Sequence, residues 1–476
     1  MFHKTGLIVT SSLAVCFAGC SSTTDTVGES GGGGEEIGGN PGTAGKITTD
    51  AGAGGAAGMG GKSSGSGGST AGSGGSTAGS GGSTAGSSGT TGTGGTTGAG
   101  GATGTGGING AGGIGGTTGT GGMTGTGGMT GMGGSTNATG PCDIYSAGDT
   151  PCVAAFSTVR ALYGAYRGNL YQVKKADGTT KDITPISAGG VADAAAQDTF
   201  CSGTTCTISI IYDQSGKGNH LTKAPGGSAT YGPNPDVEAV ADALPIKLNG
   251  YKAYGVHVVG ASSWTATGQV GYRNTKTTGV AKGDNPETEY MVTDGTYYNG
   301  SCCFDFGNAE MQPVAGGYGT MEAIYFGSCN WWDTGAGSGP WIMADLEVGV
   351  YSMGGANAYS DANKNGTKAN SSDVPFSYPF VTAMLKGNSS KATNGGPFTL
   401  KGGNAQSGAL TTVWDGAYPV GYSPMNRQGG IVLGVGGDNS SMAHGNFYEG
   451  VMTTGYASTE TDSAVQANIV AAGYGH

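Results

Sequence analysis

Apolar residues in the C-terminal two thirds of the chain recur with a period of two, the spacing of β-strands with one buried face. Residues 206–212 alternate in this way and are rich in β-branched side chains. Residues 170–175 and 179–183 flank Asp177-Gly178, a pair typical of a two-residue hairpin turn. Further strands are predicted over residues 341–350, 429–435 and 447–453.

A single segment near the C-terminus has the features of a good helix. Residues 464–472 form its body, Ser458 or Thr459 is a suitable N-cap, and Gly473 is a stop signal. Many short strands, tight turns and little helix favour an all-β fold of the β-sandwich class.

The N-terminus resembles an export signal. Residues 1–4 are a short basic start, and residues 7–18 are an apolar run too short to span a bilayer. Small residues precede Cys20, as in the lipobox of bacterial lipoproteins. We therefore expect residues 1–20 to be a lipoprotein signal peptide with Cys20 as the lipidation site. The mature protein would then be exported and anchored to the outer membrane, at the cell surface or in the periplasm. The alternative is an ordinary signal peptide with a chance cysteine.

Residues 21–140 consist mostly of Gly, Ser, Thr and Ala and contain short repeats. This segment has too few apolar side chains to offset the chain entropy of folding, which predicts a disordered linker. Residues 141–476 have a normal supply of apolar side chains and are long enough for one domain.

The formal net charge is -11, and the basic residues are few and scattered. Nucleic-acid binding needs clustered Lys and Arg, so a neutral polymer or a small polar ligand is the better expectation. The five histidines lack the spacing of metal ligands. We expect no metal, no other cofactor and a monomer.

Of the nine cysteines, Cys16 and Cys20 belong to the signal segment, and the other seven have spacings typical of local disulfides. Because seven is odd, one thiol is left over, and Cys329 has no near neighbour. Cys302 and Cys303 are adjacent. Cα atoms lie about 3.8 Å apart across a trans peptide, below the usual disulfide span. The two residues either form a flat apolar plate or remain separate thiols, one of which pairs elsewhere.

Two segments carry candidate chemistry. On a strand over 341–350, Asp345 and Glu347 share a face with Trp341 and Met343, and the even-numbered residues 342–348 point into the core. Neighbouring like charges raise the pKa of one acid and usually serve function. The alternative is an exposed strand face with two harmless acids.

The second segment is an apolar strand that runs into Gly436, Gly437 and Asp438. Glycines permit close approach of a ligand to the backbone. The alternative is a turn in which Asp438 caps its own backbone.

Six motifs in order resemble glycoside hydrolase family 54, whose members are type B α-L-arabinofuranosidases. They lie at residues 141–152, 197–201, 211–221, 302–310 (Cys302-Cys-Phe-Asp-Phe-Gly-Asn-Ala-Glu310), 339–347 (Gly339-Pro-Trp-Ile-Met-Ala-Asp-Leu-Glu347) and 434–440 (Gly434-Val-Gly-Gly-Asp-Asn-Ser440).

The resemblance implies a concanavalin-like β-sandwich, or jelly roll, and a retaining mechanism. It places Glu347 as the nucleophile and Asp438 as the general acid/base. Asp345 and Gly437 fall on sugar-binding positions, and Asp345 is expected to keep Glu347 ionised through hydrogen bonding. Trp341 lies beside them as a further candidate contact.

The resemblance also implies three disulfides, namely Cys142–Cys152, Cys201–Cys206 and a vicinal Cys302–Cys303 bond that packs against the sugar. Val348-Gly349 stands where the family has two asparagines, so contacts beyond the nucleophile are expected to differ. The chain is expected to lack the family's C-terminal arabinose-binding module.

The expected activity is exo-acting release of L-arabinose from plant cell-wall arabinan, arabinoxylan or arabino-oligosaccharides. Retention predicts carboxyl groups roughly 5–5.5 Å apart. The alternatives are a non-catalytic, lectin-like sandwich and a retaining hydrolase for another furanoside or a xyloside.

Overall fold

The computed structural model describes residues 139–263, 267–354, 369–388 and 398–476. The predicted signal peptide with Cys20, and the predicted linker up to residue 138, lie outside these residues. None of the helices in the described residues combines the length and the apolar character that crossing a membrane requires.

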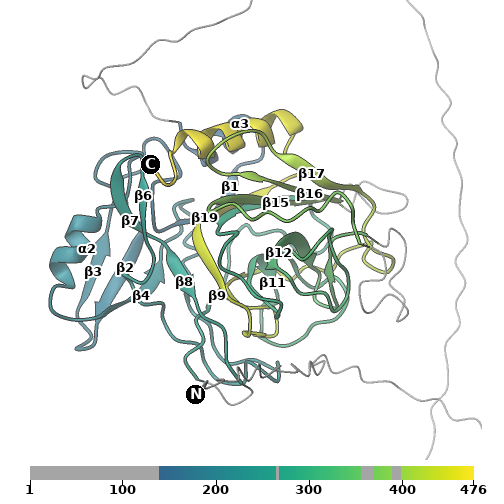
Figure 1. Cartoon of the computed structure of the whole chain (residues 1–476), viewed down its shortest axis with the longest axis horizontal. Coiled ribbons are helices and arrows are strands. Elements are labelled where there is room, and N and C mark those ends of the chain that lie inside the picture. The colour runs from purple at the N-terminus through teal and green to yellow at the C-terminus, as the bar shows by residue number, and fades with distance from the viewer. Residues whose placement is uncertain (1–138, 264–266, 355–368, 389–397) are drawn as a thin grey trace, which may run out of the picture. The chain divides into compact units, whose positions relative to one another are not determined.

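Two seven-stranded antiparallel sheets form the body of the domain (Figure 1). The first sheet has the order β1 (Cys152–Ser157), β19 (Gly445–Thr454), β10 (Glu287–Thr293), β15 (Val381–Gly387), β16 (Phe398–Asn404) and β17 (Thr411–Gly416), with β8 (Val256–Val258) paired to β19. The second sheet has the order β14 (Val350–Tyr351), β13 (Trp341–Asp345), β12 (Glu322–Gly327), β11 (Asp305–Ala309), β18 (Gly430–Leu433), β9 (Tyr272–Asn274) and β5 (Thr222–Lys223).

The main core lies between these sheets, where inward-facing side chains of both interdigitate. Phe306 of β11 contacts Phe156 of β1 and Phe447 of β19, with ring centroids 6.2 and 5.3 Å apart. All three rings are fully buried, and burying one aromatic or aliphatic side chain contributes about 1.5–3 kcal/mol. This arrangement confirms the predicted all-β sandwich.

Two smaller sheets accompany the sandwich. One has the order β3 (Thr180–Ile183), β2 (Tyr171–Lys175), β4 (Cys206–Ile211), and the other pairs β6 (Pro245–Leu248) with β7 (Tyr251–Tyr254). The predicted hairpin between β2 and β3 is confirmed, and it turns at Gly178, whose φ is 85°. A positive φ of this kind is what Gly supplies in a tight turn.

The predicted C-terminal helix is α3 (Thr459–Ala471), and the Ser458 side chain accepts the N–H of Thr461 as its N-cap. It lies over the outer face of the first sheet, where Val465 and Ile469 share a buried cluster with Val451 of β19 (Figure 1).

Two further helices contradict the expectation of a single one, namely α1 (Pro141–Ala147) and α2 (Ala194–Phe200). Each has seven residues, too few to display a helical period clearly.

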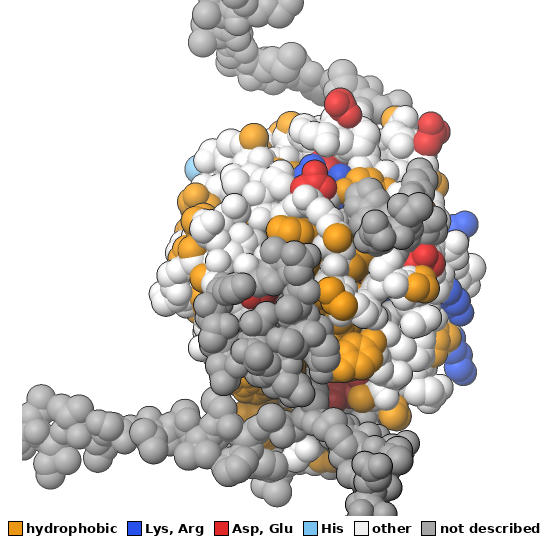
Figure 2. Space-filling model, turned by 90° about the vertical axis from the view of Figure 1, so that its right-hand side faces the viewer, with side chains coloured by type: hydrophobic (Ala, Val, Ile, Leu, Met, Phe, Trp, Pro, Cys, Tyr) orange, Lys and Arg blue, Asp and Glu red, His pale blue; other side chains and the backbone are white. Residues whose placement is uncertain are grey.

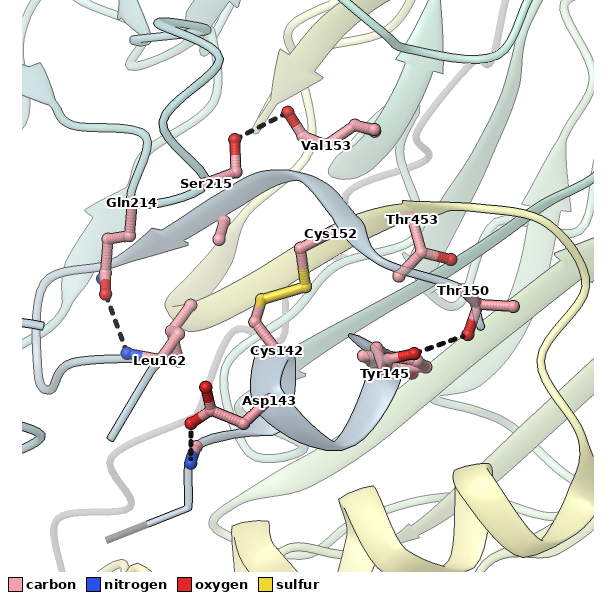
Figure 3. Close-up of a disulfide and its surroundings, with 12 residues drawn as sticks. Cys142, Asp143, Tyr145, Thr150, Cys152, Val153, Leu162, Gln214, Ser215 and Thr453 are labelled. Atoms are coloured by element: carbon pink, nitrogen blue, oxygen red, sulfur yellow. Dashed lines mark hydrogen bonds between the residues drawn. A yellow bond between two sulfur atoms is a disulfide. The ribbon is translucent and has the colours of Figure 1, made fainter. Parts of the chain in front are cut away.

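A disulfide between Cys142 and Cys152 ties α1 to the start of β1 (Figure 3). Beside it, Asp143 accepts the Gly140 N–H at 2.8 Å, and Thr150 donates to the Tyr145 carbonyl at 3.3 Å. A second disulfide, Cys201–Cys206, joins the end of α2 to β4. Cys329 keeps a buried thiol.

The face in Figure 2 is composed mostly of uncharged polar groups with scattered hydrophobic side chains. The Lys and Arg side chains visible on this face are few, and several line one edge. A surface with this character suits a neutral, hydroxyl-rich ligand better than a polyanion.

Candidate active site

The strand predicted over residues 341–350 is interrupted. β13 ends at Asp345, and β14 returns antiparallel to it, with Asp345 opposite Val350. Positive φ values at Glu347 (78°) and Gly349 (134°) turn the chain between the two strands. Ile342, Ala344 and Leu346 do enter the main core as predicted, but Val348 is half-exposed, because it lies in the turn.

Asp345 and Glu347 are therefore brought together by a hairpin turn and not by strand alternation. The Glu347 N–H donates to Asp345 Oδ1 at 2.9 Å, so Asp345 fixes the backbone of the neighbouring acid. Burial raises the pKa of Glu347, and the charges of Glu310, Asp438 and Asp345 raise it further. The expectation that Asp345 keeps Glu347 ionised is wrong, because its negative charge opposes that ionisation.

Asp438 follows β18 by five residues and is nearly buried. Its Oδ1 accepts the Ser440 N–H at 2.9 Å and the Ser440 hydroxyl at 2.5 Å. Asp438 thus caps its own turn, as the alternative interpretation held. It also lies close enough to Glu347 to affect its pKa, so the two interpretations are compatible.

Gly437 lies against the carboxyl groups of Glu347 and Glu310, which a side chain at this position would displace. A Cβ on this residue would lie 2.6 Å from Glu347 Oε2, 2.0 Å from Glu310 Oε2 and 2.9 Å from Met321 Sδ. Real Cβ atoms essentially never approach neighbours that closely. The glycine lets the loop after β18 pack directly against both carboxyl groups.

Arg273 of β9 holds this loop in place. Its guanidinium donates to the carbonyls of Gly437 at 2.7 Å and Glu310 at 2.6 Å, with longer bonds to Gly436 and Gln312. The side chain is buried, and burial lowers its pKa although the surrounding carboxylates raise it. One buried cation therefore holds together the loop that contains Gly437 and the loop that contains Glu310.

Cys302 and Cys303 are joined by a disulfide, and the peptide bond between them is cis. Sγ of Cys303 lies 3.2 Å from Asp345 Oδ2. These three residues are the only group within the described ranges whose donor atoms could surround a metal ion. Since both sulfurs are engaged in the disulfide, they offer no thiolate ligand.

The disulfide packs in a small apolar cluster with Trp341 and Met343. Trp341 is 4% exposed and donates its Nε1–H to the Ala336 carbonyl at 2.8 Å. It therefore supports the disulfide from within the protein, and it does not present the open ring face expected of a sugar contact. Trp331 and Trp332 pack against the same cluster and remain half-buried. Two adjacent tryptophans in a polar loop are the sequence feature that could have indicated this packing around the disulfide. The strand pattern did not include them.

Two acids of the site were also missed. Asp305, the first residue of β11, is fully buried, and its carboxyl group lies against that of Asp345. Burial raises the pKa of Asp305, and burial also raises the pKa of Asp345, to about 7. Glu310 follows β11 and contacts Glu347. Both acids lie inside the motif at 302–310, and that motif is the sequence feature that could have identified them.

Val348 and Gly349 are held by the turn. The Val348 carbonyl accepts the hydroxyls of Tyr422 at 2.5 Å and Tyr351 at 3.1 Å. A Cβ on Gly349 would lie 2.6 Å from the Tyr351 hydroxyl oxygen. The glycine that replaces an expected asparagine therefore allows Tyr351 to pack against the turn.

Comparisons with known proteins lead to the same family that the sequence motifs resemble. The family model for the catalytic domain of α-L-arabinofuranosidase B matches residues 141–475. The α-L-arabinofuranosidase B of Aspergillus oryzae is 53% identical over 342 residues, which cover 71% of this chain and 63% of that protein. The α-L-arabinofuranosidase of Hypocrea jecorina is 54% identical with the same coverage. The chain thus spans somewhat less than two thirds of the length of these relatives.

These relatives are fungal enzymes, and they contradict the expectation of a bacterial outer-membrane lipoprotein. The predicted outer-membrane localisation and the lipid anchor at Cys20 are corrected accordingly. The prediction depended on a few residues before one cysteine, too short a pattern to separate a lipobox from a chance cysteine.

A solved arabinofuranosidase in complex with arabinofuranosyl-α-1,2-xylobiose is 51% identical, with a TM-score of 0.64, and the match covers 71% of this chain and 66% of that one. A mutant of a family 54 α-L-arabinofuranosidase, soaked with 4-nitrophenyl α-L-arabinofuranoside, matches equally well. With the family model matching residues 141–475, more than half of the chain, the chain belongs to the α-L-arabinofuranosidase B family, glycoside hydrolase family 54.

Proposed function

We propose that this protein is a retaining, exo-acting α-L-arabinofuranosidase that releases L-arabinose from arabinofuranosyl side chains. The observation that carries the proposal is the convergence of Glu347 and Asp438 beside Gly437, next to Asp345 and the Cys302–Cys303 disulfide. The family and the bound sugars named for the solved relatives support the same substrate class.

The proposed roles follow from the chemistry of two carboxyl groups. Asp438, protonated, gives its proton to the glycosidic oxygen as the leaving group departs. Glu347 attacks the anomeric carbon as a carboxylate and forms a glycosyl ester. Asp438 then removes a proton from water, and that water releases arabinose and restores Glu347. Two inversions at the anomeric carbon give net retention.

The other groups would bind and orient the sugar. Asp345 would accept a hydrogen bond from a hydroxyl of the arabinose ring, since its carboxyl group faces the vicinal disulfide against which the ring would lie. The disulfide offers an apolar surface for a face of that ring. The half-buried Trp331 and Trp332, which pack against the cluster around the disulfide, would contact the next sugar of the substrate. We propose arabinoxylan, arabinan or their oligosaccharides as the source of the side chain.

The test is hydrolysis of 4-nitrophenyl α-L-arabinofuranoside by the full chain, its Glu347→Gln variant and its Asp438→Asn variant. Wild type should release 4-nitrophenol, and Glu347→Gln should lose several orders of magnitude in kcat/KM. Asp438→Asn should lose less on this substrate than on an arabino-oligosaccharide, because 4-nitrophenolate leaves without protonation. Glu460→Gln, in the exposed first turn of α3, is the matched control and should match wild type.

Proton NMR of the first product made tests the stereochemistry, and the α-anomer should appear before mutarotation. Equal activity of wild type and Glu347→Gln would refute the nucleophile. The β-anomer as first product would refute retention. Sugar binding without hydrolysis would show that the fold works here as a lectin.

A further inference from the structure

The proposed general acid, Asp438, lies in the loop after β18 and not on a strand. A general acid must be held at the leaving oxygen, because a displacement of about 1 Å can cost roughly a factor of 100 in rate. Ser440, in the same loop, binds Oδ1 of Asp438 and so orients the side chain. This local contact does not fix where the loop itself lies, so a further contact must do so.

The backbone of Asp438 is bonded to a second loop, residues 226–232, which follows β5 at the edge of the second sheet. This loop folds back on itself, with the Gly227 N–H donating to the Gly232 carbonyl at 2.7 Å. The Ala229 N–H then donates to the Asp438 carbonyl at 3.1 Å. The position of the acid therefore depends on a segment about 200 residues away in the chain.

The two loops pack so closely that two glycines are needed between them. A Cβ on Gly227 would lie 2.1 Å from the Asp438 carbonyl oxygen. A Cβ on Gly232 would lie 1.7 Å from the Asn439 carbonyl oxygen. Neither glycine adopts the left-handed backbone. Close approach of the two backbones is therefore what requires glycine at both positions.

Asn439, directly after the acid, holds the two loops together. It is fully buried and has a φ of 71°, a conformation that asparagine adopts more readily than most residues. Its Nδ2 donates to the Gly232 carbonyl at 3.1 Å and lies 3.5 Å from Asp236 Oδ1. Asp236 is itself buried, and its N–H donates to the Ala224 carbonyl at 3.0 Å. One amide group thus contacts two anchored points of the segment after β5.

We infer that Asn439 is a positioning residue for the general acid. Its left-handed backbone makes the turn directly after Asp438, and its side-chain amide holds that turn against residues 226–232. Since Oδ1 of Asp438 is bonded to Ser440, the proton that the acid delivers belongs on Oδ2, and the placement of Oδ2 depends on this turn. The inference rests on the proposed role of Asp438 and deepens it.

The test replaces Asn439 by Gly in the full chain. Glycine adopts the left-handed backbone readily, so this variant removes the amide and leaves the turn possible. Gly227→Ala is a second variant, which displaces the Asp438 backbone from the side of the partner loop. Asn249→Gly is the matched control, because Asn249 also has a positive φ, 48°, but lies in the turn between β6 and β7.

Two substrates separate misplacement of the acid from general damage. The sugar leaving group of an arabino-oligosaccharide needs a proton, whereas 4-nitrophenolate leaves without one. We expect Asn439→Gly and Gly227→Ala to lose roughly 10- to 100-fold in kcat/KM on the oligosaccharide. Both should stay within about threefold of wild type on 4-nitrophenyl α-L-arabinofuranoside. Asn249→Gly should match wild type on both substrates.

Sodium azide supplies a readout that a merely structural defect would not move. A misplaced Asp438 also removes the proton of water poorly, so the glycosyl ester on Glu347 accumulates and kcat falls. Azide attacks the anomeric carbon as an anion, and the bond to Glu347 breaks without the help of a base. Azide should therefore raise the kcat of Asn439→Gly on the 4-nitrophenyl substrate, with arabinofuranosyl azide as product, and leave that of wild type unchanged.

Equal losses on both substrates, no loss on either, or an azide addition that changes nothing would overturn the inference. Amide hydrogen exchange of residues 436–441 needs no activity, and it should be faster in Asn439→Gly than in wild type and in Asn249→Gly. If wild type cleaves no arabinofuranoside, the proposed function fails, and hydrogen exchange still decides whether Asn439 holds this loop. Unchanged exchange in Asn439→Gly would then overturn the inference on its own.

Discussion

Asp373 provides a test of how burial governs the stability of this fold. It is fully buried, its Oδ1 accepts the Ile342 N–H of β13 at 3.3 Å, and its Oδ2 lies 2.6 Å from the Ser352 hydroxyl. Burial raises its pKa from the ordinary value of 3.8 to about 8, and the charge of Asp333 adds to the shift. The folded protein therefore keeps a proton that the unfolded chain releases.

The sign and size of the effect follow from linkage. A raised carboxyl pKa contributes stability that is complete below the unfolded pKa of 3.8 and is lost as pH rises through about 8. Between pH 5 and pH 8 the folded state holds this proton and the unfolded state does not. The free energy of unfolding therefore falls by about 1.36 kcal/mol for each of about three pH units. The loss is thus about 4 kcal/mol.

The assay is urea unfolding, followed by tryptophan fluorescence, of wild type and Asp373→Asn at pH 5 and pH 8. Asn imitates the protonated acid and does not titrate, so the variant should lose about 4 kcal/mol less than wild type over this range. Asp236 and Glu287, whose pKa values burial raises to about 7 and about 8, titrate in both proteins and cancel from the comparison. Equal pH dependence in the two proteins would refute the argument that Asp373 is buried with its proton.

Two further predictions concern the glycine beside the acids and the disulfide that ties α1 to β1. Gly437→Ala should lower kcat/KM by roughly 100-fold or more with little change in melting temperature, because a Cβ there lies 2.0 Å from Glu310 Oε2 and displaces the acids. A large fall in melting temperature, or activity close to wild type, would contradict this. Replacing both Cys142 and Cys152 by Ser opens a link with a sequence separation of 10 and should cost about 3 kcal/mol in urea unfolding. A variant as stable as wild type would show that the other contacts of α1 hold this helix in place without the disulfide.

Local patterns were enough to predict the parts of the fold that depend on local physics. The β2–β3 hairpin follows from a turn pair between alternating strands, and α3 follows from its cap and stop residues. The interruption of the 341–350 strand could not be predicted in this way. A glutamate rarely adopts a positive φ, so its residue type gave no sign of the turn at Glu347.

The site was predicted in part for a similar reason. Glu347 and Asp438 emerged from strand spacing and family resemblance, and both lie where the acids gather. Glu310 and Arg273 were missed because their importance depends on how the ends of β11, β18 and β9 meet in space. Strand periodicity indicates which face a residue occupies, but it does not tell which distant strands become neighbours.

The left-handed backbone of Glu347, with φ 78°, has a consequence for engineering. A non-glycine residue in this region costs of order 1–3 kcal/mol, and burying its carboxyl group beside other acids adds to that cost. Replacing Glu347 by Gly removes both penalties together with the nucleophile. An inactivated variant of this kind should therefore be more robust than the working protein, so this turn is where the molecule trades stability for activity.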